Sequence, residues 1–145
     1  AYTGKSLAQA TRLEASSLTQ LDQLSAAYTD LSSWKAASEG AVDRSGELVQ
    51  LLGCVGRSRA YGSFWAACML AEGAVDTVVD ASLSFYEVAA LLPLIREAGG
   101  VASTLEGDLP EHAGVSVDGV HPVSLVASNT AAVQQQVLEA LAPQP

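Results

Sequence analysis

Apolar positions along the chain follow two patterns, helical spacing and short continuous runs. Apolar residues three or four positions apart predict helices, and short apolar runs bounded by polar residues or glycine predict strands. The predicted helices span residues 43–55, 63–72, 84–98 and 130–141. The predicted strands span residues 24–29, 58–61, 74–79, 101–105 and 124–127. This alternation predicts a layered α/β fold in which helices cover a mostly buried sheet.

The segments outside this pattern are polar or rich in glycine, serine and proline. Residues 30–42 and 106–122 are predicted to be loops, the second with room for a hairpin. Residues 1–23 do not form a unit of their own, although weak alternation at residues 11–15 allows a strand. We therefore expect a single α/β domain over residues 1–145, in which residues 1–23 are a loosely attached N-terminal segment.

Short polar residues mark the expected starts of the first and last helices. Asp43 or Ser45 is expected to cap the first helix, and Ser128 or Asn129 the last, because their side chains can accept hydrogen bonds from amides of the first turn. Gly73 is placed as a helix-ending glycine.

The third predicted helix carries the clearest start signal. Ser84 and Glu87 form an S-x-x-E capping box, in which the Glu87 side chain reaches back to the Ser84 amide. A carboxylate in the first turn also suits the helix dipole. Pro93 lies within this helix and lacks an amide hydrogen, so a kink or a missing hydrogen bond is expected there.

Composition narrows the classes of function. The chain has 145 residues, 49% of them hydrophobic, which is enough for the core of one domain. The 16 acidic and 7 basic residues give a formal net charge of -9, which argues against nucleic acid as a partner. The chain has no apolar run that approaches the ~20 residues needed to span a bilayer, so no membrane partner is expected.

Cysteine usage bears on the compartment. Cys54 and Cys68 lie inside apolar helical patterns, which predicts two small core residues and favours a reducing, cytoplasmic setting. The chain begins at Ala1 and not at Met, so we expect a processed, trimmed or incompletely represented chain. It shows no signal-peptide pattern.

The remaining aromatic and histidine side chains have simple interpretations. Trp34, Phe64 and Trp65 are predicted to pack in the core or at an interface. His112 and His121 have no carboxylate or cysteine at metal-ligand spacing, so they are predicted to be exposed loop histidines.

Ligands in α/β sheets bind where strands end and helices begin. These junctions fall at residues 61–63, 79–87 and 127–130. Gly62 and Ser63 start a predicted helix, where free amides can bind an anion or a polar edge of a substrate. The alternative for this pair is a tight turn with Ser63 as the N-cap.

Asp80 follows a predicted buried strand at the second junction. Its carboxylate could accept hydrogen bonds from substrate hydroxyls or from an amine. The alternative is a turn-forming aspartate before Ala81 and Ser82.

The middle and end of the chain carry an ordered series of motifs. They are Arg59-Ala60-Tyr61-Gly62, Leu70-Ala71-Glu72-Gly73-Ala74-Val75-Asp76, Val79-Asp80, Tyr86-Glu87-Val88-Ala89-Ala90, Glu97-Ala98-Gly99-Gly100 and, at residues 124–129, SLVASN. Asp80 stands seven residues before Glu87. The series resembles the C-terminal half of the inositol monophosphatase family, especially its bacterial histidinol-phosphatase-like branch. The resemblance covers residues 56–141 well and residues 1–55 loosely.

This resemblance implies the C-terminal half of an inositol-monophosphatase-like fold and a Mg²⁺-dependent phosphomonoesterase. It implies that Glu87 binds metal in the complete protein, and that Gly62, Ser63 and Asp80 contact the substrate. The implied substrate is a small phosphorylated metabolite, with histidinol phosphate first and an inositol or sugar phosphate next. The family is commonly dimeric, so a homodimer is expected.

Two positions depart from the family's pattern. The family's Trp-Asp pair is Tyr86-Glu87 here, and Ser63 replaces the acidic residue that often follows the glycine in the histidinol-phosphatase branch. The extra methylene of Glu87 moves its oxygens by ~1.5 Å, whereas metal geometry tolerates errors of about 0.2 Å. Glu87 therefore either binds metal in an assembled protein or only caps its helix.

A larger part of the family's site has no counterpart here. The family builds most of its metal site in its N-terminal half, from a Glu and an Asp-Pro-x-Asp-Gly-Thr segment. The nearest string is VDGV at residues 117–120, which lacks the first Asp and the Thr. We therefore expect the catalytic half to be absent, assign no catalytic residue, and expect this chain to be inactive alone. The alternative is a degenerate, non-catalytic family member that acts as a binding or assembly module.

Overall fold

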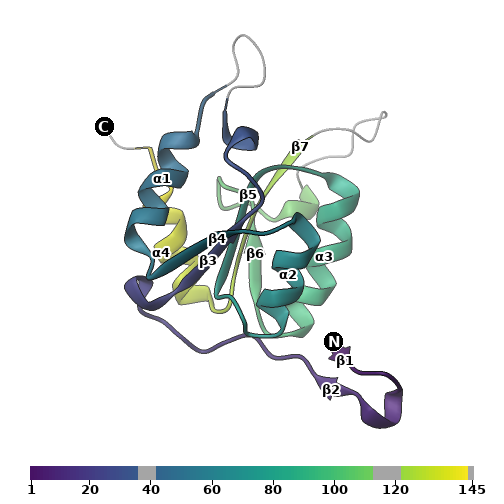
Figure 1. Ribbon diagram of the computed structural model, residues 1–145. Coiled ribbons are helices and arrows are strands. Elements are labelled where there is room, and N and C mark those ends of the chain that lie inside the picture. The colour runs from purple at the N-terminus through teal and green to yellow at the C-terminus, as the bar shows by residue number, and fades with distance from the viewer. Residues whose placement is uncertain (36–41, 113–121, 144–145) are drawn as a thin grey trace.

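A mixed sheet with helices on both faces forms the body of the protein (Figure 1). The computed structural model describes residues 1–35, 42–112 and 122–143. The strands are β1 Tyr2–Thr3, β2 Thr11–Arg12, β3 Ser25–Tyr28, β4 Arg57–Ala60, β5 Thr77–Ser84, β6 Val101–Ser103 and β7 Pro122–Ser128. The α-helices are α1 Ser45–Cys54, α2 Ser63–Ala71, α3 Phe85–Glu97 and α4 Ala131–Ala140. Single 3₁₀ turns lie at Leu7–Gln9, Leu21–Gln23, Ser32–Trp34 and Pro110–His112.

The main sheet has the strand order β4-β3-β5-β7-β6. Strand β3 pairs in parallel with β4 and with β5, whereas β7 is antiparallel to both β5 and β6. Helices α2 and α3 cover one face, and α1 and α4 cover the other (Figure 1). The predicted layered α/β architecture is therefore confirmed.

Strand β5 supplies both cores because its side chains alternate between the two faces. Val78 packs with the residues under α2 and α3, including Leu70 and Ile95. Val79 packs on the opposite face with the residues under α1 and α4, including Trp34. The predicted core position of Trp34 is correct, since only 1% of it is exposed.

The strand observed in place of the one predicted at residues 74–79 begins and ends later in the sequence. Strand β5 begins at Thr77 and continues to Ser84, because pairing with β7 carries it past a register shift between Asp80 and Leu83. Asp80 therefore lies inside a strand, and the prediction that it ends the strand or forms a turn was wrong. The local sequence could not show this, since the extension depends on a partner strand at Pro122–Ser128.

Some residues for which the sequence predicted a core position, or a core or interface position, lie on the surface of this chain. Cys54 is exposed and Cys68 is half-buried, so the prediction of two core cysteines was wrong for Cys54. Phe64 and Trp65 are 64% and 56% exposed, so they do not pack in the core of this chain. Helical spacing identifies a helix, but it does not say which of its faces meets the sheet.

Two helix starts differ from their predicted caps. Thr130, not Ser128 or Asn129, is the N-cap of α4, and its hydroxyl accepts a hydrogen bond from the Val133 amide at 3.2 Å. Ser128 belongs instead to strand β7.

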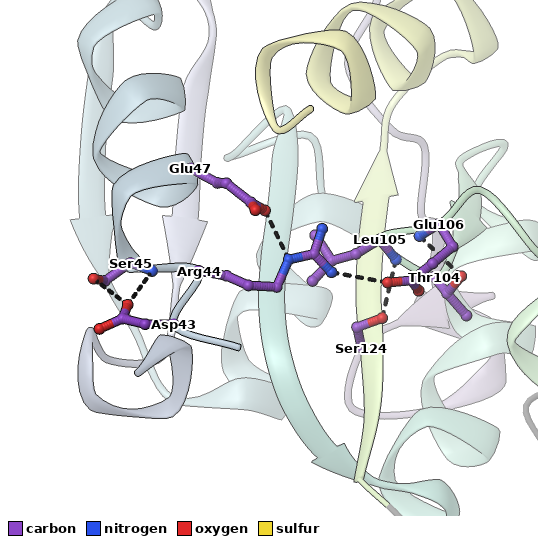
Figure 2. A network of polar contacts seen from close by, with 8 residues as sticks. All are labelled: Asp43, Arg44, Ser45, Glu47, Thr104, Leu105, Glu106 and Ser124. Carbon is purple, nitrogen blue, oxygen red and sulfur yellow. Dashed lines mark hydrogen bonds and ion pairs between the residues drawn. The ribbon is translucent and has the colours of Figure 1, made fainter. Parts of the chain in front are cut away.

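At the start of α1, Arg44 takes the N-cap position. The Asp43 carboxylate accepts hydrogen bonds from the Ser45 amide and hydroxyl at 2.9 and 2.6 Å. Figure 2 shows that Arg44 also reaches across to the β6–β7 side of the sheet. Its guanidinium binds Glu47 at 2.7 Å and Glu106 at 2.8 Å, which fastens α1 to the chain after β6.

A buried polar cluster closes the end of the sheet where β3 and β5 begin. Asp76 is 4% exposed, and its carboxylate accepts hydrogen bonds from the Ser16 hydroxyl and from the Ser25 amide, the latter at 2.7 Å. The backbone of Asp76 donates to the Ser25 carbonyl and accepts from the Asn129 amide, each at 2.9 Å. One residue thus joins β3, β5 and the end of β7.

The same cluster fastens part of the N-terminal segment. The side-chain amide of Asn129 donates to the Ser16 hydroxyl and to the Leu18 carbonyl, both at 2.8 Å. The Ala15 amide donates to the Ala98 carbonyl at 2.9 Å. Residues 15–18 therefore run along the base of the sheet, while β1 and β2 form a small separate ribbon (Figure 1).

Gly73 ends α2 in the left-handed conformation with a φ of 73°, as its predicted role requires. A Cβ at this position would lie 3.0 Å from the Glu14 carbonyl oxygen, so glycine also permits the close approach of the N-terminal segment. Among the described residues, no helix is both long enough and apolar enough to cross a membrane. His121 and the VDGV string at residues 117–120 lie outside the described residues.

Removing the Asp76 carboxylate should destabilise the protein. In Asp76→Ala, the buried Ser25 amide and Ser16 hydroxyl lose their acceptor, so the free energy of unfolding should fall by about 3 kcal/mol. Urea denaturation followed by circular dichroism measures this change. Asp108→Ala, at an exposed carboxylate, should stay within about 0.5 kcal/mol of wild type. Equal losses in both variants would contradict a special role for Asp76.

Candidate functional site

The candidate residues lie close together at the end of the sheet where the parallel strands have their carboxyl ends. Tyr28 and Ala60 are opposite each other at the ends of β3 and β4, and the Tyr61 amide continues the pairing with a 2.8 Å bond to the Tyr28 carbonyl. Parallel pairing also brings the residue after Tyr28 level with Asp80 on β5. Helices α2 and α3 both start from this edge (Figure 1). The fold therefore brings Gly62, Asp80 and the start of α3 to one end of the sheet.

Asp80 is the most deeply buried of these residues, with 1% exposure. Its Oδ1 accepts a hydrogen bond from the Thr29 amide at 2.8 Å. In the described part of the chain, its Oδ2 and the Thr29 hydroxyl have no hydrogen-bond partner. Asp80 therefore has one buried oxygen without a hydrogen bond from the described residues.

Burial raises the pKa of Asp80 to about 6. Hydrogen bonding from Thr29 lowers this pKa, and the nearby carboxylates of Asp30 and Glu87 raise it further. A cation or a hydrogen-bond donor placed beside Asp80 would favour its ionised form and so would bind more tightly above this pH.

Asp30 is a candidate that the sequence analysis missed. It lies two residues after the end of β3, and its Oδ1 accepts hydrogen bonds from the Ser32 hydroxyl at 2.5 Å and the Ser33 amide at 2.8 Å. These bonds lower the pKa of Asp30, so it carries a negative charge near Asp80. The available signal was an aspartate directly after a predicted strand, but the strand's parallel partner was needed to bring it near Asp80.

Glu87 lies at the third position of α3 and closes the predicted capping box. Its Oε2 accepts hydrogen bonds from the Ser84 amide at 2.9 Å and from the Ser84 hydroxyl at 2.5 Å. The predicted capping role is confirmed. A metal ion at this oxygen would compete with both hydrogen bonds, so metal binding by Glu87 stays a prediction.

Gly62 is the N-cap of α2, which begins at Ser63, so the alternative with Ser63 as the N-cap was wrong. The backbone of Gly62 is extended, with φ −63° and ψ 149°, and a Cβ there would meet no atom within 4 Å. Glycine is therefore not required by the local backbone, and the space beside it is open. An anion or a polar substrate edge could approach the first amides of α2 from this side.

Mg²⁺ prefers several oxygen ligands in octahedral geometry. Asp30, Asp80 and Glu87 offer such oxygens, but the described residues contain no group of three His, Cys, Asp or Glu side chains placed to hold a metal ion. The described residues therefore do not complete a magnesium site by themselves, and metal binding by Glu87 rests on the resemblance alone.

One of the surface hollows lies near the start of α3, and a larger one lies elsewhere. A space of about 300 Å³ is lined by Ser82, Leu83, Ser84 and Pro122, next to the cap of α3. A larger space of about 660 Å³ lies beside α4 and Arg44, away from the candidate residues. The larger space is mostly apolar, and none of the candidate residues lines it, so size alone does not mark the site.

Asp80 should make stability depend on pH. Its pKa is about 6 in the folded protein against 3.8 for the ordinary group, so its stabilising contribution is complete below pH 3.8 and is lost as pH rises through 6. Between pH 5 and 8, wild type should lose about 1 kcal/mol of unfolding free energy relative to Asp80→Asn, which cannot ionise. Urea denaturation at several pH values measures this difference. An exposed control, Asp22→Asn, should track wild type, and a pH-independent difference for Asp80→Asn would refute the assignment.

Comparison with known proteins agrees with this geometry. The model of the inositol monophosphatase family matches residues 3–144. The chain is 40% identical over 114 residues to a histidinol-phosphatase of Streptomyces coelicolor, covering 79% of this chain and 41% of that protein. It is 39% identical over 106 residues to a histidinol-phosphatase of Mycobacterium tuberculosis, covering 73% of this chain and 39% of that protein. The chain thus spans about two fifths of the length of the curated relatives it matches.

Solved structures share the fold. An inositol monophosphatase from Zymomonas mobilis superposes with a TM-score of 0.71 at 21% identity, covering 89% of this chain and 46% of that one. An inositol monophosphatase from Anabaena gives 0.68 at 17% identity, covering 89% and 47%. From the match over residues 3–144 and the two curated relatives, the chain belongs to the inositol monophosphatase family, on its histidinol-phosphatase-like branch.

Proposed function

We propose that this chain is the C-terminal part of a Mg²⁺-dependent phosphomonoesterase that acts on a small phosphorylated metabolite. Histidinol phosphate is the leading substrate, because the curated relatives are histidinol-phosphatases, and an inositol phosphate is the next. One structural observation carries the proposal. The buried carboxylate of Asp80 lies near enough to Asp30 and Glu87 for their charges to raise its pKa, at the end of the sheet where α2 and α3 start.

Each element at this edge has a distinct task in the proposed reaction. When bound, Mg²⁺ would supply an activated water and neutralise charge on the leaving oxygen. Glu87 would contribute one oxygen ligand at the start of α3. Asp80 would accept hydrogen bonds from the alcohol part of the substrate, and Gly62 would leave room for that substrate at the start of α2.

The proposal includes inactivity of this chain alone. The described residues place no third metal ligand next to these carboxylates, so the remaining ligands must come from elsewhere in the complete protein. The second candidate is a non-catalytic family member that serves as a binding or assembly module. It is favoured by Glu87, whose Oε2 already serves the capping box.

The first test compares this chain with the full-length protein. Full-length protein should release phosphate from histidinol phosphate when Mg²⁺ is present and should stop when the metal is chelated. The 145-residue chain, assayed in parallel, should release none. Phosphate release by this chain would overturn the claim of inactivity, and an inactive full-length protein that is correctly folded would favour the binding module.

The second test separates the two roles of Glu87. Glutamine can close the same capping box, so Glu87→Gln should leave the unfolding free energy of the full-length protein within about 0.5 kcal/mol of wild type. Loss of a charged metal ligand should still reduce kcat/KM by about 100-fold and raise the Mg²⁺ concentration needed for activity.

Two further variants make this second test decisive. Glu87→Asp retains a charged ligand and should keep more activity than Glu87→Gln. Glu139→Gln, on α4, is the control and should match wild type. Full activity in Glu87→Gln would show that the residue only caps its helix.

A further inference from the structure

The turn after β3 holds a charged carboxylate in a fixed position. Besides accepting hydrogen bonds from Ser32 and Ser33, Asp30 uses its carbonyl oxygen to accept a bond from the Ser33 hydroxyl at 3.1 Å. Three hydrogen bonds within four residues make this turn rigid. The adjacent Thr29 amide is thereby held toward Asp80, to which it donates at 2.8 Å.

Among the described residues, no cation forms an ion pair with the carboxylates of Asp30 and Asp80. The paired arginines, Arg44 and Arg96, bind other carboxylates. Asp80 is 1% exposed and still has an oxygen without a hydrogen-bond partner there. Buried polar atoms in proteins are usually hydrogen bonded, so this oxygen is expected to accept a bond from a ligand donor. The negative charge of Asp30 favours a donor that is positively charged.

We propose that Asp30 is a specificity-determining residue that selects phosphomonoesters carrying a cationic amine over those carrying only hydroxyl groups. This inference rests on the proposed phosphatase function. The ammonium group of such a substrate is attracted by the charge of Asp30 and donates a hydrogen bond to Asp80. A polyol phosphate can satisfy Asp80 with a hydroxyl but gains nothing from the charge of Asp30.

The variant Asp30→Asn tests this role in the full-length protein. Asparagine keeps the oxygen that accepts the Ser32 and Ser33 bonds, so the turn should remain while the charge is lost. KM for histidinol phosphate should rise about tenfold, the loss expected for one charge-assisted contact, with kcat within about twofold of wild type. KM for an inositol monophosphate should stay unchanged.

Asp43→Asn is a matched control. Asp43 accepts hydrogen bonds from the amide and hydroxyl of Ser45 in a similar turn, which Figure 2 shows at the start of α1 beside Arg44. This variant removes the same charge from a turn of the same kind and should alter neither KM. Equal changes in KM for both substrates in Asp30→Asn, or no change for either, would overturn the inference.

A binding measurement separates this inference from the proposed function. Histidinol carries the amine but no phosphate, so calorimetry with full-length protein reads the amine contact without any hydrolysis. If wild type hydrolyses neither phosphomonoester, the proposed function fails. The inference then stands only if histidinol binds wild type about tenfold more tightly than Asp30→Asn, and it fails if the two proteins bind equally or wild type does not bind.

Discussion

The buried carboxylate of Asp76 is the constraint on which the rest of the structure depends. A carboxylate this deeply buried is tolerated only when its oxygens are hydrogen bonded, and here both are, by Ser16 and Ser25. The backbone of the same residue binds Ser25 and Asn129. The beginnings of β3 and β5, the end of β7 and the N-terminal segment are therefore fixed relative to one another at one end of the sheet.

Asp80, inside β5, contrasts with Asp76, which directly precedes that strand. Asp80 is as buried as Asp76, yet within the described residues only one of its oxygens is hydrogen bonded, by the Thr29 amide. Its pKa rises to about 6 because burial is not fully compensated. A buried carboxylate with an unpaired oxygen lowers stability, and local costs of this kind are typical of functional sites.

In the proposed function, the end of the sheet around Asp80 is one wall of the substrate site. It combines a buried carboxylate, a charged turn at Asp30, the start of α2 at Gly62 and the capped start of α3 at Glu87. The described residues do not complete a metal site, and the chain spans about two fifths of its curated relatives. A wall of this kind can hold and orient a substrate, while the chemistry needs ligands from the rest of the protein.

The sequence by itself determined the order of helices and strands, the capping box of Glu87, the helix-ending Gly73 and the family, because these depend on local spacing. Tertiary structure alone decided that β5 runs past Asp80 and that Asp30 lies beside it, because both follow from strand pairing between distant segments. It also decided that Phe64 and Trp65 are exposed, since α2 is apolar nearly all round and its sequence does not select the side that meets the sheet. Local hydrogen bonds depend on residues that are neighbours in the sequence. The burial of a side chain, and the distance between charges on different segments, depend on which surfaces meet when the chain folds.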